Sequence, residues 1–332
     1  MPRPIVVVSA PIHQDGIDLL TEHFTVRHAH HPQVSEDELG AALVDADAVI
    51  VRSAPISAEL LARSKKLKVI AKHGAGLDSV DVDAATGLGI VVANSGDANS
   101  GSVAEHAVTL MLAALHQVPG IDRAVRLDGY RQRDVMVLGD LSGSTVGLAG
   151  FGNIARRVAQ MCRAGFGARV IALDPAVSSE EMAAHGVAKA DDLHHLLEQS
   201  DVLSIHVPLT PHTRHLIGPD QLKLMKPNAI IVNTARGGIL DEKALLDALD
   251  QGRLRGAGLD VFEQEPPDVS DPLFASDRVV LSPHVAGGTE LARKLAARAA
   301  ARAAVDVISG RQPEHLINAA VLGNARVALE ER

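Results

Sequence analysis

Three side chains in the second half of the sequence have the chemistry needed to move a proton beside a substrate acid. The first, Arg236, follows the apolar run AIIVNTA and precedes Gly237 and Gly238. A planar guanidinium binds a carboxylate through two parallel hydrogen bonds, so Arg236 could hold a substrate acid and polarise a neighbouring carbonyl. Alone, it could equally form a structural ion pair with Asp241 or Glu242.

The other two are a histidine and a glutamate. His284 follows the strand-like run VVLSP, and Glu265 precedes a proline pair in GLDVFEQEPP. An imidazole exchanges protons near neutral pH, and a carboxylate on its second nitrogen favours the protonated ring and fixes its tautomer. Taken singly, His284 is one of 16 histidines, and a surface polar position is the simpler interpretation.

A glycine pattern predicts a dinucleotide site. In TVGLAGFGNIARRVAQMC, Gly150, Gly152 and Ala155 follow an apolar strand and open a helix. They allow a tight turn, close approach of a pyrophosphate and close helix packing, and the helix N-terminus faces the anion. Asp174 ends the next apolar run about 20 residues later, where an acid binds ribose hydroxyls and repels a 2'-phosphate. We therefore expect NAD rather than NADP; the alternative is a structural turn without a ligand.

Short β-branched runs must position these residues, and they alternate with amphipathic helical patterns. We expect a first set of strands at 5–10, 47–53, 67–74 and 89–95. A second set is expected at 144–152, 168–175, 201–210, 228–238, 255–262 and 278–284. Strands that are apolar throughout indicate doubly wound parallel sheets covered by helices on both faces, an α/β fold.

Two polar or glycine-rich joints divide the chain. One is the linker 94–102, followed by a long helix at about 102–117, and the other is HVAGGT at 284–289, followed by an alanine-rich helix. We expect residues 1–98 and 288–332 to form a substrate domain, with a nucleotide-binding domain at 99–287 inserted into it. The two would be hinged over a cleft.

Composition narrows the class of protein. The 332 residues have a net charge of -9, 2% aromatic residues and no Trp, which disfavours nucleic-acid and anionic-membrane partners. The apolar run Ile5–Val8 is too short for a signal peptide, and no run approaches the roughly 18 residues of a membrane span. Cys162 stands alone, so we expect a small buried residue in a reducing, cytoplasmic setting.

Other histidines carry weaker signals. RHAHH at 27–31 has no acid or cysteine at ligand spacing, so we expect a loop there and no metal. His194 and His195 lie in a polar helical context and are expected at the surface.

Several ordered motifs resemble one family. GLAGFGNIA, HVPLTPHTRHLI, NTARGGILDE, GLDVFEQEP and SPHVAGGT are similar to the D-isomer-specific 2-hydroxyacid dehydrogenases over nearly the whole chain. The resemblance implies a Rossmann NAD-binding domain inserted into a flavodoxin-like substrate domain, usually in a homodimer. It implies an NAD-dependent oxidoreductase that interconverts a D-2-hydroxy acid and its 2-oxo acid. By position, Arg236 is the carboxylate-binding arginine, His284 the general acid/base and Glu265 its partner.

The resemblance also assigns binding residues. Asp260 would meet the nicotinamide carboxamide and Asp174 the ribose. The substrate carboxylate would be received by backbone amides of Gly74, Ala75 and Gly76. The remaining cofactor contacts are expected at Phe151, Asn153, Ile154, Val207, Pro208, Thr213, Thr234, Ala235, His284 and Gly287.

The far end of the substrate is assigned by a narrower resemblance. Arg52, Ser53 and Asn99 look most like the phosphoglycerate dehydrogenase branch, which makes 3-phosphoglycerate and phosphohydroxypyruvate the first candidate pair. A structural or solvated role remains the alternative for Arg52. His73, beside the carboxylate loop, and Tyr130, where many relatives carry Trp, depart from the pattern. The sequence ends soon after HLINAAVL, so we expect a short form without the regulatory domain of some relatives.

Two further functions remain open. One is a glyoxylate or hydroxypyruvate reductase. The other is a non-catalytic NAD(H)-sensing protein, because some relatives on this scaffold act as corepressors.

Overall fold

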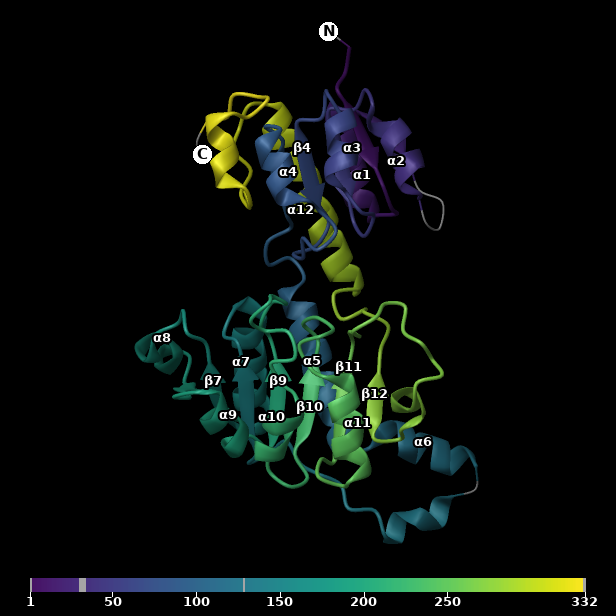
Figure 1. The fold of residues 1–332 in the computed structure, drawn as a ribbon, viewed down its shortest axis with the longest axis vertical. Helices are drawn as coiled ribbons and strands as arrows, with labels where there is room; N and C mark the ends of the chain where they lie inside the picture. The colour runs from purple at the N-terminus through teal and green to yellow at the C-terminus, as the bar shows by residue number, and fades with distance from the viewer. Residues whose placement is uncertain (1, 30–33, 128, 331–332) are drawn as a thin grey trace. The chain divides into compact units, whose positions relative to one another are not determined.

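The chain forms two α/β units, each with its own sheet (Figure 1). The computed structural model describes residues 2–29, 34–127 and 129–330. Its contacts assign residues Met1–Asn99 and Gly287–Arg332 to the first unit and Ser100–Ala286 to the second. The chain thus leaves the first unit once, builds the second and returns.

The first unit has a five-stranded parallel sheet. Its strands are β1 Ile5–Val8, β2 Thr25–His28, β3 Ala48–Val51, β4 Val69–Lys72 and β5 Val91–Ala93. Its helices are α1 Gln14–His23, α2 Glu36–Leu43, α3 Ala58–Arg63, α4 Val82–Gly87 and α12 Glu290–Ile308, and a short 3-10 helix spans Ala319–Gly323.

The strand order in the first unit is β2-β1-β3-β4-β5, the flavodoxin-like order. Helices α1 and α12 pack on one face, and α2, α3 and α4 share a second core on the other. The alanine-rich α12 packs closely because small side chains such as Ala297 and Ala300 are fully buried. The predicted fold of this unit is confirmed.

The second unit has a seven-stranded parallel sheet. Its strands are β6 Thr145–Ala149, β7 Arg169–Leu173, β8 Ala188–Lys189, β9 Val202–Ile205, β10 Ile230–Asn233, β11 Gly256–Leu259 and β12 Val279–Leu281. Its helices are α5 Ser100–Leu115, α6 Val118–Arg126, α7 Asn153–Phe166, α8 Ser179–Ala184, α9 Leu193–Gln199, α10 Pro219–Leu224 and α11 Glu242–Asp250, with 3-10 turns at Tyr130–Asp134 and Pro272–Ala275.

The strand order in the second unit is β12-β11-β10-β9-β6-β7-β8. This is the doubly wound dinucleotide-binding order extended by one strand, with its topological switch between β6 and β9. Helices α5 and α7 cover one face, and α9, α10 and α11 cover the other. The predicted Rossmann fold is confirmed, and its switch point lies where the glycine pattern begins.

Some predicted element boundaries were wrong. Arg27 and His28 of the predicted RHAHH loop belong to β2, an edge strand with mostly exposed side chains, while His30 and His31 lie outside the described residues. Such a strand has no apolar run to reveal it. The two-residue β8 was missed for the same reason. The long helix begins at Ser100, so the end of the predicted linker is its first turn.

Three observations complete the fold. Among the described residues, no helix is both long and apolar enough to cross a bilayer. The same part of the chain contains no group of three or more His, Cys, Asp or Glu side chains that could hold a metal ion. Cys162 is buried, and burial raises the pKa of its thiol to about 12.

Candidate active site

The residues predicted to do chemistry in the second unit all follow strands at the carboxyl edge of its sheet. Arg236 follows β10, Glu265 follows β11 and His284 follows β12, and these three strands are neighbours. Gly150 follows β6 and Asp174 follows β7 at the same edge. Open α/β sheets bind ligands along this edge, so the topology collects the predicted residues on one side of the unit.

The turn after β6 has the geometry of a phosphate loop. Gly150 has a φ of +97°, and a Cβ there would lie 2.7 Å from the His206 carbonyl oxygen. Gly152 begins α7, and a Cβ there would meet no atom within 4 Å. The first glycine is therefore required by the turn, and the second leaves open space in front of the helix N-terminus.

Asp174 is tied to this loop. Its Oδ2 accepts a hydrogen bond from the Phe151 amide at 2.9 Å, and its Oδ1 accepts one from Ala176 at 2.9 Å. The carboxylate thus fixes the glycine loop against the end of β7. Each oxygen keeps a second lone pair with which it could accept from a ribose hydroxyl.

The other predicted cofactor residues lie in loops at the same edge or in the first turn of α7. Asn153 and Ile154 begin α7, and Val207 and Pro208 follow β9. Thr213 closes the next turn by donating to the Pro208 carbonyl at 2.7 Å. Thr234 and Ala235 follow β10, and the buried Thr234 Oγ1 has no hydrogen-bond partner among the described residues.

These observations fit a bound dinucleotide. The open space at Gly152 would accept a pyrophosphate without displacing a side chain. The unsatisfied Thr234 hydroxyl would find its partner in a polar group of the cofactor, because a buried hydroxyl without a partner costs roughly 1–3 kcal/mol.

The histidine and the glutamate meet directly. His284 Nδ1 lies 2.7 Å from Glu265 Oε2, and Glu265 Oε1 accepts from the Phe262 amide at 3.2 Å. The side chains are 48% and 38% exposed. A carboxylate on Nδ1 fixes the hydrogen there and leaves Nε2 to exchange a proton with another molecule.

Arg236 lies in a loop held by hydrogen bonds from side chains to backbone carbonyls. Asn233 Nδ2 donates to the Arg236 carbonyl at 2.8 Å, and Arg236 Nη1 donates to the Ala235 carbonyl at 2.7 Å. A Cβ on Gly237 would overlap the Phe262 carbonyl, so the loop after β10 packs tightly on the loop that leads to Glu265.

The acids proposed as structural partners of Arg236 accept from backbone amides. Asp241 accepts from the Ala244 amide at 2.9 Å and caps α11. Glu242 accepts from the Glu263 amide at 2.6 Å. Both carboxylates therefore help to hold α11 and the loop after β11.

Asp260 is fully buried. Its Oδ1 accepts from the Val285 amide at 2.9 Å and from Ser282 Oγ at 2.6 Å, and its Oδ2 accepts from the Ala286 amide at 2.9 Å. The residue expected to meet the cofactor thus holds the turn around His284. Ser282 was missed from the sequence because only its tertiary contact distinguishes it from any serine before a proline.

The first unit brings other residues together at the carboxyl edge of its own sheet. Val51 pairs with Lys72, so Arg52 and His73 follow neighbouring strands. His73 is 9% exposed, and its Nε2 has no hydrogen-bond partner among the described residues. Burial, followed by the charge of Arg52, lowers the pKa of His73 to about 4. The ring is therefore neutral at pH 7.

The predicted carboxylate loop follows directly. Gly74 has a φ of +126°, and its amide donates to Ser95 Oγ at 3.1 Å. In the described part of the chain, the amides of Ala75 and Gly76 donate to no acceptor, so these two are available to an anion. Ser53 is exposed after β3.

The last two predicted residues, Asn99 and Gly287, lie at the two crossings of the chain. A Cβ on Gly287 would come within 2.8 Å of Asn99 Nδ2, so the two residues are in close contact.

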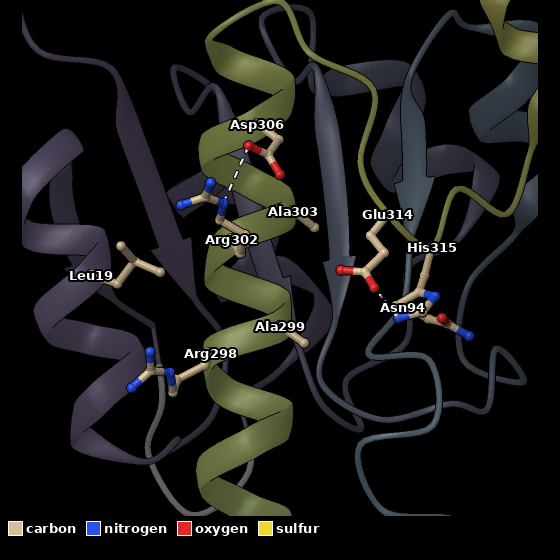
Figure 2. A pocket seen from close by; sticks show the side chains of 9 residues that line it. All are labelled: Leu19, Asn94, Arg298, Ala299, Arg302, Ala303, Asp306, Glu314 and His315. Carbon is tan, nitrogen blue, oxygen red and sulfur yellow. Dashed lines mark ion pairs between the residues drawn. The ribbon is translucent and has the colours of Figure 1, made fainter. Parts of the chain in front are cut away.

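A pocket elsewhere in the first unit is a different feature. It has a volume of about 370 Å³, is lined partly by α12 and contains none of the predicted site residues. Figure 2 shows Arg302 pointing toward Asp306, 3.4 Å away, and Asp306 also pairs with Arg311 at 2.9 Å. Arg298 pairs with Asp15 at 3.3 Å. These ion pairs give its charged side chains partners within the protein.

Comparison with known proteins accounts for this arrangement. The family model of the D-isomer specific 2-hydroxyacid dehydrogenase NAD binding domain matches residues 108–286. The chain belongs to this family. Its second unit therefore carries the family's NAD-binding domain, and the predicted cofactor is NAD.

Individual relatives agree with the family. A D-3-phosphoglycerate dehydrogenase of Methanocaldococcus jannaschii is 40% identical over 94% of the chain, which spans only 59% of that relative's length. A glyoxylate reductase of Thermococcus onnurineus is 36% identical over 99% of the chain and 100% of its own length. The structure of Rhodotorula graminis D-mandelate dehydrogenase superposes with a TM-score of 0.87 at 28% identity, covering 96% of this chain and 98% of that one.

Proposed function

We propose that this protein is an NAD-dependent oxidoreductase that interconverts a D-2-hydroxy acid and its 2-oxo acid. The observation that carries the proposal is the 2.7 Å contact between His284 Nδ1 and Glu265 Oε2. This pair lies at the same sheet edge as Arg236 and the glycine loop, so an acid/base group, a carboxylate-binding group and a cofactor loop serve one side of the unit.

In the proposed mechanism, each residue has one task. When bound, NAD would supply the hydride chemistry, by transfer of a hydride to or from C2 of the acid. His284 donates its Nε2 proton to the carbonyl oxygen on reduction and takes it back on oxidation. Glu265 stabilises the protonated ring. Arg236 holds the substrate carboxylate and stabilises the oxygen as negative charge develops.

A phosphorylated substrate is the first candidate, because the first unit presents positive charge. Burial, followed by the charge of Arg293, lowers the pKa of Arg52, so an anion would stabilise this group. The amides of Ala75 and Gly76 would receive the carboxylate. We therefore propose phosphohydroxypyruvate and 3-phosphoglycerate, with glyoxylate or hydroxypyruvate as the alternative.

One assay separates these alternatives. The protein is mixed with NADH and, in turn, glyoxylate, hydroxypyruvate and phosphohydroxypyruvate, and loss of absorbance at the nicotinamide band is followed. We expect the highest kcat/KM with phosphohydroxypyruvate. NADH binding without consumption by any 2-oxo acid would instead indicate an NAD(H)-sensing protein.

A variant sharpens the substrate assignment. Arg52→Gln should raise the KM for phosphohydroxypyruvate by at least about tenfold, the effect of losing a charged hydrogen bond. It should leave the KM for glyoxylate, which has no distant charge, almost unchanged. Equal losses with both substrates would assign Arg52 a structural role.

We also propose that the protein acts as a homodimer in a reducing, cytoplasmic setting. Helix α6 buries none of its residues and exposes Val118 and Val125, and exposed apolar side chains continue beyond it at Leu127, Val135 and Val137. A second copy would cover this surface, because contiguous exposed apolar patches mark interaction sites. Light scattering of the wild type and of the double variant Leu127→Glu, Val135→Glu tests this, with a monomer expected only for the variant.

A further inference from the structure

A chain of hydrogen bonds connects helix α5 to the turn that carries His284. His106, in the first half of α5, places its Nε2 2.8 Å from Ser282 Oγ and 3.5 Å from Asp260 Oδ1. Ser282 Oγ in turn donates to Asp260 Oδ1 at 2.6 Å. All of these residues belong to the second unit.

Counting hydrogens fixes the direction of this chain. A serine hydroxyl has a single hydrogen, and Ser282 gives it to the carboxylate of Asp260. The hydroxyl oxygen can then only accept from His106. The imidazole must therefore have a hydrogen on Nε2, and the chain runs from His106 through Ser282 to Asp260.

Asp260 links these hydrogen bonds to the turn that carries His284. Its side chain accepts from the amides of Val285 and Ala286, and its carbonyl oxygen accepts from the His284 amide at 2.7 Å. One buried aspartate therefore binds His284 itself and the two residues that follow it, Val285 and Ala286.

The turn needs this restraint. His284 has a φ of +52°, in the left-handed region that non-glycine residues seldom adopt. Such a conformation costs on the order of 1 kcal/mol or more and persists only where its surroundings determine it. A buried carboxylate is itself stable only when donors satisfy its oxygens, and in the described part of the chain Ser282 is the only side-chain hydroxyl that donates to Asp260.

We propose that His106 is a positioning residue for the reaction proposed above: through Ser282 and Asp260 it sets the orientation of the turn that presents His284. The inference rests on the proposed function for its effect on turnover, but the hydrogen-bond chain itself can be tested without turnover. In the proposed mechanism His106 touches neither the reacting atoms nor the cofactor.

The first experiment examines the rings directly. Long-range 1H–15N NMR spectra of the full chain, labelled at histidine, report which ring nitrogen has the hydrogen. We expect His106 to have a hydrogen on Nε2, with its signals assigned by their loss in His106→Gln. A ring with its only hydrogen on Nδ1 would overturn the proposal.

The second experiment compares four variants. His106→Leu removes the donor, His106→Gln keeps an N–H at similar reach, and Ser282→Ala breaks the same chain without altering α5. His194→Leu is the matched control, because His194 is an exposed histidine on a helix of the same unit. Each is measured for kcat and KM with NADH and phosphohydroxypyruvate, glyoxylate and hydroxypyruvate, for NADH affinity by fluorescence, and for the NMR signals of His284.

The expected pattern separates positioning from simple folding. In His106→Leu and Ser282→Ala, kcat should fall roughly 10- to 100-fold and the His284 signals should move, while NADH affinity changes little. His106→Gln should recover most of kcat, and His194→Leu should match the wild type.

Two results would count against it. Wild-type kcat and unmoved His284 signals in folded His106→Leu would overturn the proposal, as would His106→Gln being as impaired as His106→Leu. If His106→Leu does not fold, the same criterion applies to Ser282→Ala. If the wild type consumes no NADH with any of the three acids, the proposed function fails, and the His284 signals alone decide whether the chain orients the turn.

Discussion

Two histidine–glutamate pairs use the same short segment after β11. His284 bonds Glu265, and His215 Nε2 lies 2.9 Å from Glu263 Oε1. Both histidines have a left-handed backbone, with φ of +52° and +49°. Their side chains are similarly exposed, at 48% and 44%.

The pairs differ in which nitrogen is bound and in what lies around it. Glu265 binds Nδ1 of His284, which leaves Nε2 for the substrate of the proposed reaction, whereas Glu263 binds Nε2 of His215. Glu263 also faces a second acid, because its amide donates to Glu242 Oε1 at 2.6 Å. If the proposed function holds, the contrast means that an imidazole beside a carboxylate is not in itself a catalytic group. The bound nitrogen and the place of the ring on the sheet edge decide.

The largest expected effect follows from removing each imidazole. His284→Ala should lower kcat by roughly 100- to 10,000-fold, the usual contribution of a general acid/base, and leave NADH affinity within a few-fold. His215→Ala should keep kcat within about threefold. Steady-state kinetics and NADH fluorescence titration measure both. Equal losses in the two variants would erase the contrast, and near-normal turnover in His284→Ala would remove this residue from the mechanism.

The carboxylates give the next largest difference. Glu265→Gln retains a hydrogen-bonding group but loses the charge that stabilises the protonated ring, so the reductive kcat should fall roughly 10- to 100-fold. Glu263→Gln is the matched control, since it makes the same change two residues away along the chain and should have little effect. A larger loss in Glu263→Gln would mean that the catalytic pair has been assigned to the wrong glutamate.

The sequence predicted which residues at the strand ends have the chemistry for catalysis, but it did not predict the contacts between them. Arg236, Glu265 and His284 could be proposed because each follows an apolar run, and the carboxyl ends of parallel strands lie at one edge. The bonds of Asp260 to the turn, and the part played by His106, could not be predicted. They join residues more than 20 positions apart, and no local pattern marks them.

The same limit applies to the fold. Strands β3 and β4 are buried along their whole length and were evident as apolar runs. The edge strand β2 has one half-buried valine, Val26, among exposed residues, so its pairing with β1 decides its conformation. Local sequence therefore predicted the centres of both sheets and the edge strands β5 and β12, and missed the opposite edge strands β2 and β8.

A third histidine, His73, extends the contrast to a ring without a carboxylate. Its pKa is lowered from 6.5 in the unfolded chain to about 4, so unfolding takes up a proton between these values. The stability due to the neutral ring is fully present above pH 6.5 and is lost as the pH falls toward 4. Between pH 6.5 and 5 the loss should be roughly 1.5 kcal/mol, from about 1.4 kcal/mol per pKa unit.

Chemical denaturation over this pH range measures the loss in the wild type and in His73→Gln, which cannot titrate. His206, whose pKa burial also lowers to about 4, is present in both proteins, so the difference isolates His73. If the free energy of unfolding depends on pH in the same way in both proteins, folding does not lower the pKa of His73.

The smallest expected effect concerns Glu242, the acid next to the His215–Glu263 pair. Burial raises the pKa of Glu242, and the charges of Glu263, Asp271 and Glu265 act in the same direction. A carboxyl with a raised pKa contributes stability that is present below its unfolded value of 4.5 and is lost as the pH rises through its folded value.

Glu242→Gln removes the charge but keeps an oxygen for the Glu263 amide. Because Glu242 is only half-buried, the variant should gain less than about 1 kcal/mol at pH 7, a rise of at most about 2 °C in Tm. The gain should shrink below pH 4.5. Asp241→Asn, which alters the neighbouring helix cap, is the control and should show no such gain. A lower Tm for Glu242→Gln at pH 7 would mean that the Glu242 charge stabilises this loop through the Glu263 amide, and that this bond outweighs the repulsion from the neighbouring acids.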